Sequence, residues 1–496
     1  MKPIPELRDD GAGLVLYSDG KPFLALGGEV HNSSASDLNY MREIVWPAVK
    51  RLGGNFLLVP VYWECLEPEE GAFDFTLVDG LLHQAEENGY KLGLLWFGLW
   101  KSMGSDFMPL WLKRDHSRYF LQRNGEGAPT QMVSPFCQEA LELDRRAYVR
   151  LMEHLRDYDT QRTVLLVQVE NEPGVWFYER DFSGAANKAY AQEIPPEVAE
   201  VYGVSGTWEE AFGEKAPARF MSWAYSRALE QLASAGKRVY PLPTFTNCVP
   251  SEEGFVVSGT CTPGNFAMWR KFCPSLEVYG PNAYGPRFDA IAQAFDTPEN
   301  PLWVPETDNN AAAAAKLIYA LGARNLGMFS PFGVEEYYAS LSDCDHANMG
   351  TSPDPQRDGT ALGQAYRLAL ALWPQIRLAR QEGRLSGYFL EESNLAGKTT
   401  QLDGMTVKVE TSKPGAGGLL LLRIGTREYL AFGVNTVVSF YAHRGDRAPL
   451  TVWNKREMLL QDRTLKEGRI LNGDQRNVTG FGLTPAVLKV TLDTHC

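Results

Sequence analysis

The chain has 496 residues, of which 44% are hydrophobic and 22% charged, a composition typical of a globular protein with two or three domains. The 61 acidic residues outnumber the 48 Lys and Arg residues, and the net charge of −13 argues against nucleic acid or an anionic membrane as the main partner. No apolar stretch reaches the roughly 18 residues of a membrane span, and no signal peptide is visible. We therefore expect a cytoplasmic protein, or a periplasmic or secreted one if the sequence is a trimmed mature form.

The first three-quarters of the chain alternates short apolar runs with amphipathic stretches, which is typical of buried strands separated by helices. One predicted helix has its apolar face at Leu77–Ala85 and stops at Asn88–Gly89, and another repeats small and apolar residues over Phe220–Leu232 and ends at Gly236. Eight runs are predicted to be strands, at 23–29, 55–60, 91–97, 164–169, 239–246, 276–282, 302–306 and 326–329.

Eight strands separated by helices predict an α/β fold of the (β/α)8 TIM barrel type. The main alternative is a doubly wound sheet, but Gly27-Gly28 after the first strand does not match the GxGxxG turn that such a sheet usually carries. The intervals after strands three and four are more than twice the roughly 30 residues of a βα unit. We therefore expect insertions there, at the rim where active sites form.

The chain changes character near residue 383, after a predicted helix at about 362–380. Alternating apolar positions at 405–411 and runs at 419–424, 436–441 and 486–492 are divided by Gly, Asn and Asp turns, which is typical of antiparallel strands. The run at 419–424 could instead belong to a buried helix, although its flanking Gly and Pro favour a strand. The predicted domains are a barrel over residues 1–383 and a smaller β-rich domain over 384–496.

One apolar strand, beginning at Val164, ends in Glu170-Asn171-Glu172. Reacting groups of a parallel barrel lie at the carboxyl ends of its strands. A carboxyl group beside apolar walls has a raised pKa, as a general acid working near neutral pH requires, and the amide of Asn171 could bind a substrate hydroxyl. The alternative is a polar loop with a glutamate that begins a helix.

A second glutamate, Glu306, ends the strand predicted at 302–306, and its alternative is a capping or salt-bridging surface carboxylate. Barrel closure alone could bring Glu306 near Glu172, and two carboxylates about 5–5.5 Å apart would support glycoside hydrolysis with retention. Tyr284, at the end of the neighbouring strand, could hydrogen-bond Glu306, orient it and keep it ionised, or it could be a structural loop tyrosine.

The chain resembles the clan A glycoside hydrolases, and more closely the bacterial branch of the family 35 β-galactosidases that carries an additional C-terminal β domain. The resemblance rests on GGEVHNSSAS (27–36), PVYWECLEPEEGAFDF (60–75), LLWFGLWK (94–101), LLVQVENEPG (165–174), YPLPTFTN (240–247), GPNAYG (280–285) and VPET (304–307). VENE and VPET are signals of the clan.

The resemblance implies that Glu172 is the acid/base and Glu306 the nucleophile of a retaining β-galactosidase. It also implies that Asn171 binds the sugar and that Tyr284 contacts the nucleophile. Sugar contacts are expected at the ends of strands one to three, from Glu29, His31, Tyr62, Trp96 and Trp100.

Among these expected contacts, His31 could instead be a satisfied core histidine and Trp96 could fill the barrel. Trp100 is predicted to lie beyond its strand and to stack on a sugar face. The tail WKSMG after this strand departs from the shorter polar turn that the family leads us to expect.

Other chemistries find little support, because the seven histidines are scattered without HExxH or HxH and no GxSxG or phosphate-binding loop occurs. We therefore expect no metal and no cofactor.

The predicted function is release of terminal β-linked galactose through a covalent glycosyl-enzyme. The alternatives are another clan A exo-glycosidase, of the β-glucosidase or β-mannosidase type, and a carbohydrate-binding barrel without turnover. The expected partner is a β-galactoside oligosaccharide or polysaccharide side chain, with no nucleic acid, no membrane, and a homo-oligomer as a possibility.

Overall fold

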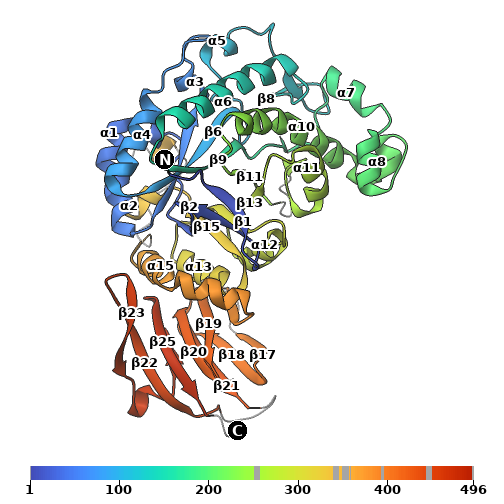
Figure 1. Ribbon diagram of the computed structural model, residues 1–496. Coiled ribbons are helices and arrows are strands. Elements are labelled where there is room, and N and C mark those ends of the chain that lie inside the picture. The colour runs from blue at the N-terminus through green and yellow to red at the C-terminus, as the bar shows by residue number, and fades with distance from the viewer. Residues whose placement is uncertain are drawn as a thin grey trace.

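The computed structural model describes residues 2–250, 257–338, 346–348, 357, 359–391, 396–442 and 449–493. Eight parallel strands form one sheet in the order β4-β15-β14-β13-β11-β9-β6-β5, with helices outside it (Figure 1). The predicted (β/α)8 barrel is confirmed, and each predicted strand run overlaps one of these strands. Their bounds are β4 Ala25–Leu26, β5 Phe56–Tyr62, β6 Lys91–Lys101, β9 Val164–Asn171, β11 Thr244–Cys248, β13 Val278–Ala283, β14 Leu302–Thr307 and β15 Leu326–Pro331.

The barrel closes where the short strand β4 meets β5. The backbone N–H of Leu58 donates to the carbonyl of Gly28 at 2.9 Å, and Glu29 forms isolated parallel bridges to Leu58 and Phe332. A Cβ on Gly27 would lie 1.6 Å from the carbonyl oxygen of Phe56, so only glycine allows this approach. The Gly27-Gly28 pair therefore closes the barrel.

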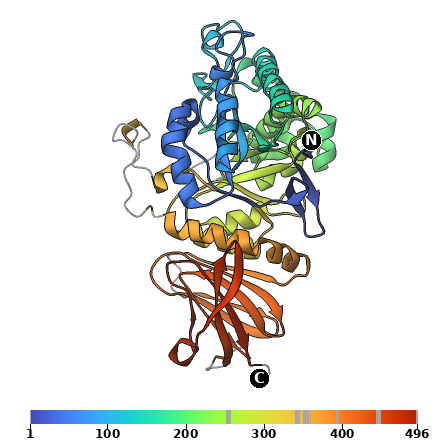
Figure 2. The ribbon, with the colours of Figure 1, turned by 60° about the vertical axis from the view of Figure 1, so that its left-hand side comes forward.

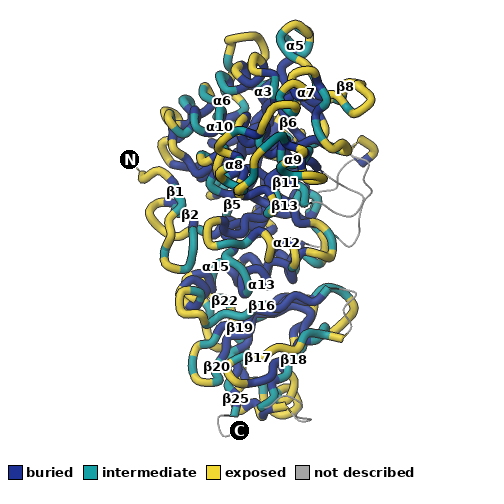
Figure 3. The backbone as a smooth tube through the Cα atoms, turned by 90° about the vertical axis from the view of Figure 1, so that its right-hand side faces the viewer, coloured by how far each residue is buried: buried dark blue, intermediate teal, exposed yellow. Residues whose placement is uncertain are grey.

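Helices cover the strands, and Figure 3 shows the strands buried while exposed residues lie on the outer elements. α10 extends to Val239, past the predicted end at Gly236, because Gly236 packs closely against Tyr148 of α6 within the helix instead of ending it. The covering helices are α2 Trp46–Leu52, α4 Thr76–Asn88, α6 Gln138–Tyr158, α10 Ala216–Val239, α11 Phe266–Phe272, α12 Phe288–Phe295, α13 Ala313–Ala323 and α15 Gly359–Gln381. No helix of the described ranges is both long and apolar enough to cross a membrane.

Two insertions enlarge one end of the molecule. The first lies between β6 and α6, and the second between β9 and α10, where Trp208 packs edge-on against Phe220. The elements of the first are α5 Leu110–Lys113, β7 Leu121–Arg123 and β8 Pro129–Val133. Those of the second are β10 Val175–Trp176, α7 Gly184–Tyr190, α8 Pro196–Tyr202 and α9 Trp208–Phe212.

The C-terminal part consists of antiparallel sheets with strand orders β16-β19-β20-β25-β22-β23 and β17-β18-β21-β24. Met405, Val407 and Val409 of β18 are buried against residues of the larger sheet, as their alternation predicts. The strands are β16 Leu385–Leu390, β17 Lys398–Leu402, β18 Met405–Thr411, β19 Gly417–Gly425, β20 Glu428–Val434, β21 Thr436–Tyr441, β22 Val452–Gln461, β23 Thr464–Ile470, β24 Thr479–Gly480 and β25 Ala486–Leu492. The run at 419–424 is therefore a strand.

Helices α13 and α15 lie between the barrel and these sheets (Figures 1 and 2). The approach is close, because a Cβ on Gly418 of β19 would lie 2.4 Å from the carbonyl oxygen of Ala315 on α13. Leu420 and Phe432 on this face of the larger sheet belong to the same apolar core as the barrel. The C-terminal sheets are therefore packed onto the barrel through a continuous core.

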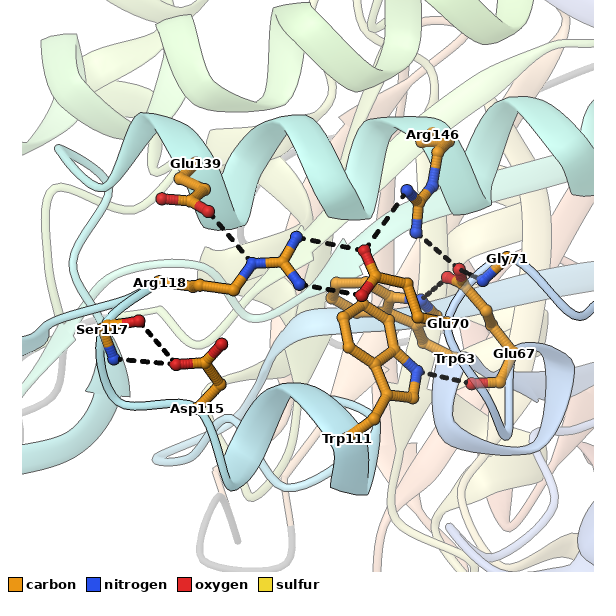
Figure 4. Close-up of polar contacts among 10 residues, drawn as sticks. All are labelled: Trp63, Glu67, Glu70, Gly71, Trp111, Asp115, Ser117, Arg118, Glu139 and Arg146. Atoms are coloured by element: carbon orange, nitrogen blue, oxygen red, sulfur yellow. Dashed lines mark hydrogen bonds and ion pairs between the residues drawn. The ribbon is translucent and has the colours of Figure 1, made fainter.

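A polar cluster ties the loops after β5 and β6 to helix α6 (Figure 4). The buried carboxylate of Glu67 accepts hydrogen bonds from the indole of Trp63 at 2.9 Å, the backbone of Gly71 at 2.7 Å and the guanidinium of Arg146 at 2.6 Å. Arg118 binds Glu70 through two hydrogen bonds, at 2.9 and 3.1 Å. These contacts hold together the loops that follow β5 and β6.

We expect Glu67→Ala to lower the free energy of unfolding by about 3–5 kcal/mol, because it leaves a guanidinium, an indole and a backbone N–H without their acceptor. Urea unfolding followed by circular dichroism measures the change. Glu139→Ala is the matched control, because that carboxylate pairs with Arg118 from a 56% exposed position and its loss should cost less than about 1 kcal/mol. Equal losses in the two variants would contradict this assignment.

Candidate active site

Glu172 follows the carboxyl end of β9 in a strained stretch of backbone. Glu170 and Glu172 have φ angles of +60° and +53°, in the left-handed region that residues with a Cβ rarely adopt. The backbone N–H of Glu172 donates to the side-chain oxygen of Asn247 at 2.8 Å. A contact from β11 thus stabilises this strained backbone. Glu172 itself is only 6% exposed.

Glu306 lies on β14 and is also only 6% exposed. The hydroxyl of Tyr284, directly after β13, donates to Glu306 Oε2 at 2.9 Å. The side-chain amide of Asn247 donates to Glu306 Oε1 at 3.0 Å. Both carboxylate oxygens are therefore fixed by donors from neighbouring strands.

Two amides bridge the glutamates. Asn282 Nδ2 donates to Glu172 Oε1 at 2.5 Å, and Asn282 Oδ1 accepts a hydrogen bond of 3.2 Å from Asn247, which also reaches Glu306. The structure thus brings together three residues that the sequence singled out, Glu172, Glu306 and Tyr284. The bridging asparagines were missed as functional residues, although Asn247 directly follows one predicted strand, in TFTN, and Asn282 ends another, in GPN.

Burial and like charge set the ionisation of this site. Burial raises the pKa of Glu306 to about 7 and the charge of Glu172 adds to the rise, while Lys101 and the Tyr284 hydroxyl oppose it. Burial raises the pKa of Glu29 well above its usual range, and the charge of Glu306 raises it further. Burial and the charge of Glu306 keep the pKa of Tyr284 high, so its hydroxyl remains a donor.

Lys101 supplies a positive charge that the sequence analysis did not assign to the site. It ends β6, is 9% exposed, and its ammonium donates to the Ser102 hydroxyl at 3.0 Å. Ser102 has a φ of +53° and donates its backbone N–H to the carbonyl of Asn171 at 3.3 Å. The unusual tail WKSMG was the signal for this residue.

Glu29 and Asn171 have polar atoms available for a ligand. Both side chains are fully buried, and neither carboxylate oxygen of Glu29 nor either amide atom of Asn171 forms a hydrogen bond of normal geometry among the described residues. The Asn171 amide nevertheless lies close enough to Glu306 to help lower the pKa of that carboxyl group. Unpaired buried polar groups are costly, and a ligand with hydroxyl groups would satisfy them.

His31 and Tyr62 are enclosed by other side chains. His31 Nε2 forms a 2.7 Å hydrogen bond with Glu336, and its ring packs edge-on against Phe332, as the alternative of a satisfied histidine predicts. Tyr62 is 3% exposed, and its ring packs against Phe107.

The predicted position of Trp100 beyond its strand is wrong. β6 continues to Lys101, so Trp100 lies on the strand and not beyond it, with no exposed surface and its indole N–H donating to the carbonyl of Val133 at 2.9 Å. Trp96 is likewise fully buried, and its indole donates to Asp144 at 2.8 Å. Both rings are buried in the barrel interior, and the N–H of each indole is already bonded within the protein.

No group of three or more His, Cys, Asp or Glu residues in the described ranges has the geometry to hold a metal ion. The reactive groups of the site are the carboxyl groups of Glu172 and Glu306, which two asparagines bridge. Two buried glutamates at the carboxyl ends of two strands of a (β/α)8 barrel are a pair of carboxyl groups of the kind that glycoside hydrolases use.

Within that class, residues 46–224 match the sequence model of glycoside hydrolase family 42, described as β-galactosidase. Residues 362–481 match a domain of unknown function, DUF5597. The expected assignment to family 35 is not supported, whereas clan A and β-galactosidase relatives are. The segments on which the resemblance to family 35 rested, among them GGEVHNSSAS (27–36) and YPLPTFTN (240–247), therefore do not identify that family. No curated protein matches the chain by sequence.

Solved structures with similar folds include three bacterial β-galactosidases. The enzyme from Bacillus circulans sp. alkalophilus is 16% identical with a TM-score of 0.47, over 65% of this chain and 52% of that one. The cold-adapted enzyme from Rahnella sp. R3 is 13% identical with a TM-score of 0.49, over 71% and 56%. The enzyme from Marinomonas ef1 is 12% identical with a TM-score of 0.43, over 70% and 68%. The chain thus spans about half the length of the first two.

Proposed function

We propose that the protein is a retaining exo-β-galactosidase that cleaves terminal β-linked galactose by double displacement. The observation that carries the proposal is the pair Glu172 and Glu306, bridged by Asn247 and Asn282 at the carboxyl ends of the barrel strands. The family 42 match over residues 46–224 supports galactose as the sugar. A β-glucosidase or a β-mannosidase would use the same chemistry on a different terminal sugar. The experiment below distinguishes these alternatives.

In the first step, a Glu306 carboxylate oxygen bonds to the anomeric carbon while the bond from that carbon to the leaving oxygen breaks. Glu172 gives its proton to the leaving oxygen, and a glycosyl ester on Glu306 results. In the second step, Glu172 takes a proton from water, whose oxygen bonds to the anomeric carbon and releases Glu306 as a carboxylate. Two inversions give net retention.

The surrounding groups suit these steps. Tyr284 and Asn247 donate to opposite oxygens of Glu306, which orients the nucleophile. Lys101 supplies positive charge near two buried carboxyl groups, Glu29 and Glu306, and lowers the pKa of each. Glu29 and Asn171 offer unpaired donors and acceptors to sugar hydroxyls.

A panel of nitrophenyl β-D-galactoside, β-D-glucoside and β-D-mannoside tests the proposal, with NMR following the first anomer released. We expect the galactoside to have the highest kcat/KM and β-galactose to appear first. Natural galactosylated oligosaccharides then define the leaving group. Initial release of the α-anomer would contradict double displacement, and faster cleavage of another glycoside would overturn galactose as the sugar.

We expect Tyr284→Phe to move the acidic limb of the kcat/KM profile to higher pH. The hydroxyl of Tyr284 stabilises the ionised form of Glu306, so its removal raises the pKa of that nucleophile above about 7, and a higher pH is then needed to ionise it. A roughly 10–100-fold loss of kcat should accompany the shift. Tyr178→Phe is a matched control at an exposed position. An unchanged acidic limb would contradict this role of Tyr284.

A further inference from the structure

Two further carboxyl groups, Asp144 of α6 and Glu170 of β9, lie together behind the catalytic end of β9. Both residues are 0% exposed. A Cβ placed on Gly98 would lie 2.6 Å from Asp144 Oδ1 and 2.5 Å from Glu170 Oε1, so these two oxygens are within about 5 Å of each other. Gly98 leaves the space that the pair occupies, since any larger residue would collide with both oxygens.

The pair is anchored to β6. Glu170 Oε1 and Oε2 accept hydrogen bonds from the backbone N–H groups of Leu99 at 3.2 Å and Trp100 at 2.7 Å. Asp144 Oδ1 accepts one from the indole of Trp96 at 2.8 Å. Asp144 Oδ2 is buried and has no partner that is a hydrogen-bond donor in the described ranges. A proton held between the two carboxyl groups would give Asp144 Oδ2 a hydrogen bond.

No cation of the described chain offsets the negative charge of this pair. The titratable groups that face it are the phenols Tyr148 of α6 and Tyr225 of α10, and burial raises the pKa of both, so they stay neutral. Burial raises the pKa of Asp144 to about 6, and burial together with the charge of Asp144 raises that of Glu170 well above its usual range. Two adjacent carboxylates without a cation cannot both ionise readily in such a place.

We propose that Asp144 and Glu170 hold one proton between them and act as positioning residues that fix the backbone of residues 170–172. The inference rests on the proposed function, because Glu172 is the group being positioned. Glu170 has a left-handed backbone, and such a conformation persists only where surrounding contacts determine it. The bonds from Leu99 and Trp100 to its side chain provide these contacts and join the ends of β6 and β9.

The shared proton makes this arrangement sensitive to alkaline pH. The pair keeps a proton in the folded state at a pH where both groups have lost theirs in the unfolded chain, so stability falls as pH rises from their unfolded values through the folded pKa of the pair. Glu170→Gln keeps a carbonyl acceptor for the Trp100 N–H and gives up the longer bond from Leu99, because an amide nitrogen cannot accept. Its amide N–H can donate to Asp144 in place of the shared proton, and residue 170 no longer titrates.

The experiment measures Tm without substrate from pH 5 to 9.5, and kcat and KM, for the wild type, Glu170→Gln, Asp144→Asn and Glu170→Ala. We expect both amide variants to lose less Tm than the wild type between pH 6 and 9. Glu170→Gln should retain kcat within about fivefold, and Glu170→Ala should lower it roughly 100-fold with KM within about threefold, as expected when a catalytic group is displaced. Glu142→Gln, exposed on the same helix, is the control and should follow the wild type.

If the curves of Tm against pH run parallel for the wild type and both amide variants, the two carboxyl groups share no proton and the proposal is wrong on this point. Full kcat in Glu170→Ala would overturn the positioning role. If Glu170→Ala does not fold, the Tm curves of the amide variants still decide the first point, and a shift in the alkaline limb of kcat for Glu170→Gln decides the second. If the wild type cleaves no glycoside while the curves diverge, the proposed function fails and the shared proton stands.

Discussion

Glu306→Ala is expected to lower kcat for β-galactosides by roughly 10⁴-fold or more, because it removes the atom that bonds to the anomeric carbon. The reason is structural: Glu306 is held by Tyr284 and Asn247 on opposite oxygens, and no other carboxyl group of the described chain has this pair of donors. Steady-state kinetics with nitrophenyl β-D-galactoside measures the loss. Glu299→Ala, whose side chain is 77% exposed, is the matched control and should retain full activity.

A 2-deoxy-2-fluoro-galactoside with an activated leaving group should label wild-type Glu306 and leave Glu306→Ala unlabelled. Mass spectrometry of the peptides locates the label, and a label on another residue would refute Glu306 as the nucleophile.

Glu306→Gln should also change stability in a pH-dependent way. The folded-state pKa of Glu306 is raised to about 7, so the stability that this carboxyl contributes is present in acid and is lost as pH rises through that value. Gln does not titrate, so the Tm of this variant relative to the wild type should rise by a few degrees between about pH 4 and 7. Inactive but stabilised protein is the expected signature of an active-site residue.

Glu172→Gln is expected to have the second-largest effect, a loss of roughly 10²–10⁴-fold in kcat for substrates with poor leaving groups. Substrates with activated leaving groups need no proton in the first step, so their loss should lie in hydrolysis of the glycosyl ester. Azide needs no general base and should restore turnover for these substrates and form β-galactosyl azide.

Glu179→Gln, exposed on the same insertion, is the matched control for Glu172→Gln. An unchanged rate in Glu172→Gln, or no effect of azide with an activated substrate, would contradict the acid/base assignment.

The strands and the two glutamates could be predicted because short-range patterns specify them. Apolar runs such as 164–169 and 302–306 are long enough for strands and too short for helices, and a glutamate directly follows the first and ends the second. The carboxyl ends of parallel strands meet at one edge, so distant glutamates on two such strands become neighbours. The additional lengths after strands three and four were visible for the same reason.

The aromatic lining could not be predicted in the same way. Strand alternation assigns Trp96 and Trp100 to one face, but the pairing of β6 with β9 shifts register between Trp96 and Lys101. After such a shift, counting residues no longer tells which side chains point to the pocket. Lys101 consequently enters the site, and both tryptophans pack inside.

Periodicity and strand ends were enough to predict the barrel, the antiparallel C-terminal strands and the positions of Glu172, Glu306 and Tyr284, because each of these is a local feature of the chain. The groups that surround them became known only from the folded chain. The bridge through Asn247 and Asn282, the charge of Lys101 and the Asp144–Glu170 pair join segments far apart in the chain. Their contacts depend on barrel closure and register, which no local pattern encodes.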